Sequence, residues 1–73
     1  MLTNGGDNMK LNVGRIKVLI ANQFLTLADL SKKCGISRQS LSTIIRRGTC
    51  TMRNAGKIAA ALKVDVAEIL KEE

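Results

Sequence analysis

One six-residue pattern recurs along the chain, and it is typical of the start of an α-helix. A hydrophobic residue precedes a capping residue, a polar residue follows three positions after the cap, and the next residue is apolar. The pattern occurs as Leu25-Thr26-x-x-Asp29-Leu30, Ile36-Ser37-x-x-Ser40-Leu41 and Val64-Asp65-x-x-Glu68-Ile69, with a weaker form at Cys50-Thr51-x-x-Asn54-Ala55. Because a capping side chain accepts a hydrogen bond from the first turn, each occurrence predicts a helix start. We expect helices at about 27–34, 38–46, 52–62 and 66–71.

A further helix is expected before these four, from about Val13 to Gln23, with Asn12 as its N-cap. Its buried side is predicted to carry Ile16, Leu19 and Ile20. The 73 residues include no proline and one aromatic residue, and the β-branched residues stand at helical intervals. These features predict an all-α fold, a compact bundle of five short helices that forms one domain over residues 11–73.

Glycines lead to one expectation for the first ten residues and another for the predicted helix at 52–62. The stretch around Gly5-Gly6 has no apolar pattern, so residues 1–10 are expected to be a disordered leader. Gly56 stands inside the predicted helix at 52–62, where glycine costs about 1 kcal/mol relative to alanine. We interpret it as a close contact between two helices.

The charges are unevenly distributed. The net charge is +6, and between Leu30 and Val64 there are eight Lys or Arg residues and no acid. A block of one sign favours a polyanion as partner, although a solvated basic face that only aids solubility would look the same.

The sequence lacks the residues that several classes of function require. The chain has no histidine, two cysteines, no carboxylate pair in one place and no Gly-rich phosphate loop, so we expect no enzyme activity, no cofactor and no metal site. No apolar run is long enough to span a membrane. The simplest expectation is a cytoplasmic protein with reduced thiols.

The residues between the second and third predicted helices have a specific spacing. Ser31 is small where two backbones would cross, Gly35 permits a positive φ, and Ser37 caps the next helix. Such a sequence predicts two helices that meet near a right angle through a tight turn. Cys34 is expected to be a buried hydrophobe and Cys50 to be partly exposed.

The helix predicted at 38–46 has two different faces. Leu41, Ile44 and Ile45 cluster within about one quadrant of the helix. The opposite side is polar and free of acids, and it carries Gln39, Thr43 and Arg46, flanked by Arg38, Ser42 and Arg47. Gln, Arg, Ser and Thr are the residue types that bond base edges in a major groove, so this face favours DNA recognition over an ordinary polar surface.

With these motifs the chain resembles the phage-repressor/Cro-like, or Xre-type, helix-turn-helix family. The resemblance covers about Val13 to Leu70 and includes "LTLADLSKKCGISRQSLSTII", the "GT" that follows, and "KIAAALKVDVAEIL". It implies a lambda-repressor-like DNA-binding fold whose third helix enters the major groove of double-stranded DNA. It also implies binding to a palindromic operator as a homodimer.

The resemblance also implies roles for individual residues. The base-reading positions of the family match Arg38, Gln39, Ser42 and Thr43. Its phosphate-contacting positions match Thr26, Thr49, Thr51, Arg53 and Asn54, to which Arg46, Arg47 and Lys57 are added on charge and position.

The sequence departs from the family at three places. Leu27 replaces the usual glutamine after the cap of the second helix, and "IIRRG" is one residue longer before its glycine than the family pattern. Ile20 and Ile45 stand where the family often has an Arg–Glu pair, so we expect these two side chains to touch.

The leading hypothesis is a sequence-specific transcriptional regulator, a repressor of a phage, mobile-element or similar bacterial locus. The alternative is an antitoxin-like or other protein-interaction module that docks a partner through Val66, Ile69 and Leu70.

Overall fold

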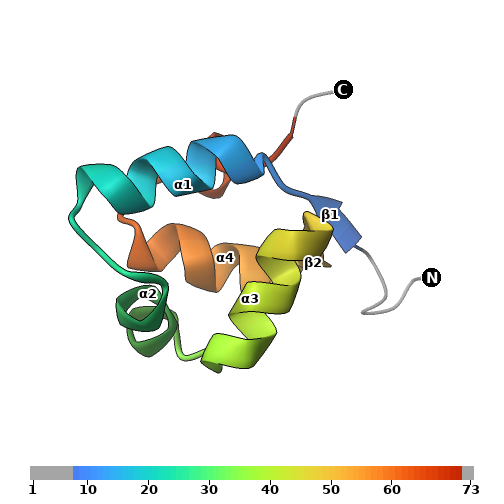
Figure 1. The fold of residues 1–73 in the computed structure, drawn as a ribbon. Coiled ribbons are helices and arrows are strands. Elements are labelled where there is room, and N and C mark those ends of the chain that lie inside the picture. Colours follow the sequence, from blue (N-terminus) through green and yellow to red (C-terminus); the bar gives the residue numbers. More distant parts are fainter. Residues whose placement is uncertain (1–7, 72–73) are drawn as a thin grey trace.

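A computed structural model describes residues 8–71. In chain order the elements are strand β1 (Asn8–Lys10), helix α1 (Val13–Asn22), helix α2 (Leu27–Cys34), helix α3 (Arg38–Arg47), strand β2 (Thr49–Thr51), helix α4 (Met52–Ala61) and the 3₁₀ turn η1 (Val66–Glu68). Helix α1 lies across the top of the view in Figure 1, with α4 below it and α2 and α3 beneath. The small β1–β2 sheet lies at the end of α3.

The predicted caps of the four α-helices are present. The side chains of Asn12, Ser37 and Thr51 each accept a hydrogen bond from the backbone N–H three residues on, at 3.0, 3.1 and 3.2 Å. Thr26 and Asp29 form a reciprocal capping box. The expected helix boundaries are correct to within one residue at every end of these helices. Local hydrogen bonding of the caps therefore determines where the helices begin.

The fifth predicted helix, at 66–71, is wrong. Only the three-residue 3₁₀ turn η1 forms there, and the Asp65 side chain makes no capping hydrogen bond. Ile69, directly after this turn, is fully buried, and Leu70 forms an isolated bridge with Leu11. The backbone leaves the helical path after one turn because it pairs with the residues that precede α1.

The all-α prediction also requires correction, because residues 8–71 contain a two-stranded sheet. Strand β1 pairs antiparallel with β2, and Met9 lies opposite Cys50. The expected disordered leader of residues 1–10 is therefore wrong for Asn8–Lys10, and its other residues lie outside the described part of the chain. Cys50, expected to be partly exposed, is a buried residue of β2, and burial raises the pKa of its thiol.

The core lies between α1, α2, α3 and α4. Its largest fully buried side chains are Ile16, Leu30, Leu41, Ile58, Leu62 and Ile69. Cys34 is buried, as predicted. Ile20 and Ile45 are half-buried and pack against this core, and their mutual contact stays a prediction.

Gly56 does not lie at a helix–helix contact. It is exposed, and a Cβ atom built on it would have no heavy atom within 4 Å. The expectation of a close contact is wrong, and packing does not require a glycine at this position.

Candidate nucleic-acid interface

The turn between α2 and α3 contains the left-handed glycine that its sequence predicts. Gly35 adopts a left-handed conformation with a φ of +73°, and its N–H donates to the carbonyl of Ser31 at 2.9 Å. Ser31 is buried, and its hydroxyl donates to the carbonyl of Ala28. The turn directs α3 away from the axis of α2, which is seen nearly end-on in Figure 1. Helix α3 is anchored on one side and open on the other.

The open side of α3 gathers four predicted base-reading residues and one predicted phosphate-contacting residue. A single surface depression, here called the α3 face, is lined by Arg38, Gln39, Ser42, Thr43 and Arg46. All of them are exposed except Thr43, which is half-buried and donates its hydroxyl to the carbonyl of Gln39 at 3.1 Å. No carboxylate of residues 8–71 lines the α3 face. It therefore presents cations, an amide and hydroxyls to whatever approaches.

The two arginines at the end of α3 point to different surfaces. Arg46 lines the α3 face, whereas Arg47 lines a second depression with Lys10, Leu11, Gly48, Thr49 and Lys71. We call this second surface the end depression. The helix stops directly afterwards because Gly48 is left-handed, with a φ of +76°, and its N–H donates to the carbonyl of Ile44 at 2.8 Å. Helix α3 thus ends at Arg47, one residue beyond its expected end.

The start of α4 holds most of the remaining predicted phosphate-contacting residues. Thr51 caps the helix and Asn54 donates its N–H to that cap. Arg53 and Lys57 are exposed and four positions apart, so they lie on the same side of α4. The first turns of α3 and α4 contain no acid, so the positive end of each helix dipole is available to an anion.

The start of α2 differs, because it already holds a carboxylate. The Thr26 N–H donates to Asp29 Oδ2 at 2.9 Å, and the Asp29 N–H donates to the Thr26 hydroxyl at 3.0 Å. Hydrogen bonds from the Thr26 backbone and side chain lower the pKa of the Asp29 carboxyl below its ordinary value. Of the predicted phosphate-contacting positions, Thr26 therefore has the least favourable surroundings for a phosphate.

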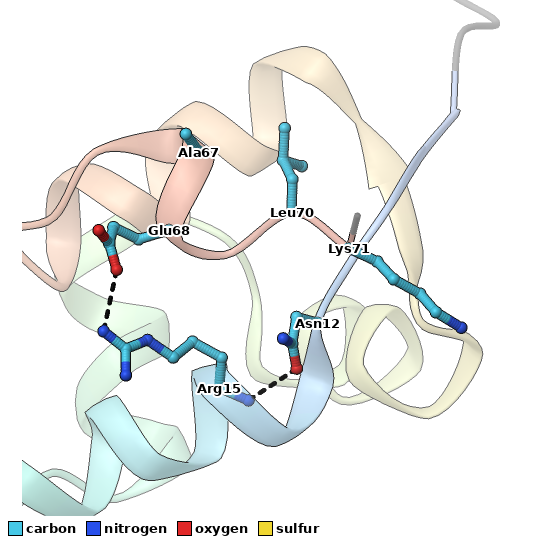
Figure 2. A pocket seen from close by; sticks show the side chains of 6 residues that line it. All are labelled: Asn12, Arg15, Ala67, Glu68, Leu70 and Lys71. Atoms are coloured by element: carbon cyan, nitrogen blue, oxygen red, sulfur yellow. Dashed lines mark hydrogen bonds and ion pairs between the residues drawn. The ribbon is translucent and has the colours of Figure 1, made fainter. Parts of the chain in front are cut away.

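The surface expected to dock a protein partner is largely occupied by the core. Ile69 is fully buried, so its predicted role in docking is wrong, and Val66 and Leu70 are half-buried and pack against the core. The neighbouring pocket is polar, and Figure 2 shows that Arg15 from α1 reaches Glu68 there. The two side chains form an ion pair at 2.9 Å, and each is about half exposed.

Among residues 8–71 there is no group of three or more His, Cys, Asp or Glu side chains that could hold a metal ion. In the same part of the chain, no helix is long and apolar enough to cross a membrane.

Comparison with known protein families agrees with this geometry. The family model for the Cro/C1-type HTH DNA-binding domain matches residues 15–73, which is most of the chain. The chain belongs to the Cro/C1-type helix-turn-helix family. This Cro/C1-type protein is thus a DNA-binding regulator, and its family is not a family of enzymes. Comparisons with curated proteins and with solved structures gave no significant match.

The end depression of this Cro/C1-type domain includes two cations that sequence reasoning missed. Lys10 comes from β1 and Lys71 follows the Leu11–Leu70 bridge, so they lie at opposite ends of the described chain. No local motif marks either lysine, since they meet through the Leu11–Leu70 bridge and the hydrogen bond from the Lys71 N–H to the Lys10 carbonyl, which join residues far apart in the sequence.

Proposed function

We propose that this protein is a sequence-specific, double-stranded DNA-binding repressor of a phage, mobile-element or similar bacterial locus. Helix α3 lies in the major groove, where Arg38, Gln39, Ser42 and Thr43 contact base edges. The observation that supports this most directly is their grouping in the acid-free α3 face, together with the cation Arg46. Repression then follows from occupancy, because a bound domain blocks access to the promoter.

Phosphate contacts would hold α3 in register. The proposed contacts are Arg46, Arg47, Thr49, Thr51, Arg53, Asn54 and Lys57, with Thr26 the weakest member because of its Asp29 partner. Phosphate contacts release counterions, so affinity should fall steeply as salt rises. The palindromic operator and the homodimer on DNA are part of this proposal and rest on the family pattern.

The test is a selection of bound sequences from a random double-stranded DNA pool, followed by titrations of the selected site. We expect a palindrome, bound by two chains when stoichiometry is measured by analytical ultracentrifugation. Gln39→Ala should relax preference at one or two positions per half-site, at a cost of about 1–3 kcal/mol for the preferred base. Arg53→Ala is the matched control and should weaken binding to all sequences alike.

A reporter gene whose promoter overlaps the selected site tests the regulatory role. The intact chain should lower its transcription, and Gln39→Ala should not. Enrichment of no sequence, together with binding that is insensitive to salt, would contradict the proposal.

A further inference from the structure

The turn between α1 and α2 exposes the single aromatic side chain of the protein to solvent. Phe24 is almost completely exposed, although its backbone is left-handed, a conformation that is unfavourable for any residue with a Cβ atom. In the monomer the ring offsets little of this cost by burial. A strained and exposed aromatic residue favours a contact with something outside the monomer.

The chain segment around this turn carries no charge. Residues 18–28 form the longest stretch of the sequence without Lys, Arg, Asp or Glu, although a quarter of all residues are charged. Ala21 and Asn22 follow Val18 by three and four positions, so these three exposed residues lie on one side of α1. We call these three residues, together with Phe24, the α1–α2 patch.

The rest of the fold holds this turn in place. The Gln23 side chain donates to the carbonyl of Leu62 at 2.7 Å, which ties the end of α1 to the end of α4. Leu25 packs against the core. Phe24 therefore projects from an ordered turn, and little conformational entropy would be lost when a partner binds it. Lys63 follows Leu62 and is exposed, so a cation stands at the edge, where the rim of an interface is polar.

The α1–α2 patch leaves the proposed DNA-binding surface free. None of its residues lines the α3 face. In Figure 1 the turn between α1 and α2 lies at the opposite end of the molecule from the β1–β2 sheet that follows α3. A partner can therefore contact the patch while α3 occupies a major groove.

A second copy of this chain fits the patch better than DNA does. A DNA backbone attracts cations, which the patch lacks. The protein carries a net charge of +6, so two copies repel each other wherever their basic surfaces meet. A patch without charges and with an aromatic residue avoids this repulsion and has the composition of an interface core. The surface around η1 offers less, because Ile69 is buried in the core and Arg15 is paired with Glu68.

We propose that two copies of this protein, bound to the two halves of a palindromic site, contact each other through their α1–α2 patches, with the two Phe24 rings at the centre. This inference rests on the proposed function and names the surface of its homodimer. A two-fold axis makes the contact isologous, so one patch on each copy is sufficient.

The small size of the patch predicts where this contact forms. A Phe side chain buries about 150–250 Å², so one ring from each copy falls well below the roughly 1,200 Å² of a stable interface. The contact is therefore too weak to hold a dimer in free solution. On DNA, neighbouring half-sites hold two chains at a high effective concentration, and there the contact appears as cooperative binding.

The experiment measures cooperative binding to the selected palindrome by fluorescence anisotropy. Each variant is titrated against the palindrome and against DNA of the same length with only one intact half-site. Phe24→Gly removes the ring and suits the left-handed turn. It should weaken binding of the second chain to the palindrome by about tenfold or more, because buried aromatic residues dominate interface energies. Affinity for the single half-site should stay unchanged. Phe24→Tyr keeps the ring and should keep the cooperativity.

An added charge provides a second test. Ala21→Lys places a cation in each patch, so like charges should reduce cooperativity, whereas affinity for a single half-site should stay equal or rise. A lysine near the end of α1 suits the helix dipole and should not disturb the fold. Ala67→Lys is the matched control, because it adds the same charge at an exposed position of η1 outside the patch, and it should leave cooperativity unchanged. Melting temperatures followed by circular dichroism confirm that each variant is folded.

The inference is overturned if Phe24→Gly and Ala21→Lys bind the palindrome as cooperatively as the unmodified chain, because the copies then meet through another face or the patch has a different partner. It is also overturned if Phe24→Gly weakens binding to the single half-site, since the ring would then contact DNA. Failure of the unmodified chain to select any DNA site would instead contradict the proposed function itself.

Discussion

Phe24 is the single aromatic residue of the chain, and it lies outside the core. Its side chain is 93% exposed, and its backbone is left-handed with a φ of +58°. A left-handed residue that carries a Cβ is strained by about 1–2 kcal/mol, whereas glycine is not. The turn between α1 and α2 therefore contains a strained residue whose ring gains little from burial.

Phe24→Gly should stabilise the protein by about 0.5–1 kcal/mol, because part of the relieved strain is offset by the freedom of glycine in the unfolded state. Thermal and urea unfolding measure the change. Lys63→Gly is the matched control, since Lys63 is also exposed and left-handed, with a φ of +62°. Stabilisation by Lys63→Gly alone would show that the Phe24 ring makes a stabilising contact.

Asp29 gives the capping box a defined pH dependence. Its pKa is lowered from 3.8 by hydrogen bonds from the Thr26 backbone and side chain. A carboxyl whose pKa is lower in the folded state stabilises the fold above its unfolded pKa, and this contribution is lost as pH falls through the folded value. We expect Asp29→Asn to reduce the loss of stability below about pH 4. Melting temperatures between pH 6 and 2 test this, and parallel curves for the two proteins would contradict it.

At the scale of the element, α4 contains a glycine that packing does not require. Because a Cβ on Gly56 would meet open space, Gly56→Ala should stabilise α4 by about 0.5–1 kcal/mol. Gly35→Ala provides the contrast, because Gly35 is left-handed, and it should destabilise by about 1–2 kcal/mol. Unfolding midpoints measure both. A lower unfolding midpoint for Gly56→Ala would contradict this, because it would mean that another part of the protein packs against this face of α4.

Sequence predicts the helices of this fold well and its strands poorly, for a physical reason. A cap such as Ser37 acts within its own first turn, so its effect is visible in a few neighbouring residues. Strand β1 has three residues, and its partner lies about forty residues away, so no local pattern identifies it. The same pairing buries Cys50, and the neighbouring Leu11–Leu70 bridge limits the last helix to a 3₁₀ turn.

The residues of the candidate site also differ in whether the sequence could predict them. The residues of the α3 face could be predicted from one helix wheel, because all of them belong to one regular element. The different directions of Arg46 and Arg47 could not, because they depend on α3 continuing to Arg47 before Gly48 ends it. Lys10 and Lys71 require the tertiary pairing of β1 and thus lie beyond any local pattern.

At the scale of the whole molecule, β1 connects the start of the fold to its end. A chain that begins at Leu11 loses the β1–β2 ladder and the hydrogen bond from Lys71 to Lys10. Each backbone hydrogen bond contributes about 0.5–1.5 kcal/mol, so this chain should be less stable by at least about 1 kcal/mol. For a domain of this size that lowers the melting temperature by about 4–8 °C. A chain that begins at Asn8 is the reference, and equal melting temperatures would show that β1 adds nothing.

The backbone hydrogen bond from Lys71 to Lys10 makes the described chain almost a closed ring, since its last residue lies against its first strand. In such a ring the order of the elements matters more than the place where the chain is cut. A circular permutant that opens at the exposed turn around Phe24 and links Lys71 to Asn8 would keep every helix and both strands in position. Its linker would cross beside the end depression, so a permuted protein that retains base selection but depends less steeply on salt would separate base reading from the phosphate contacts of Arg47 and Thr49 in one molecule.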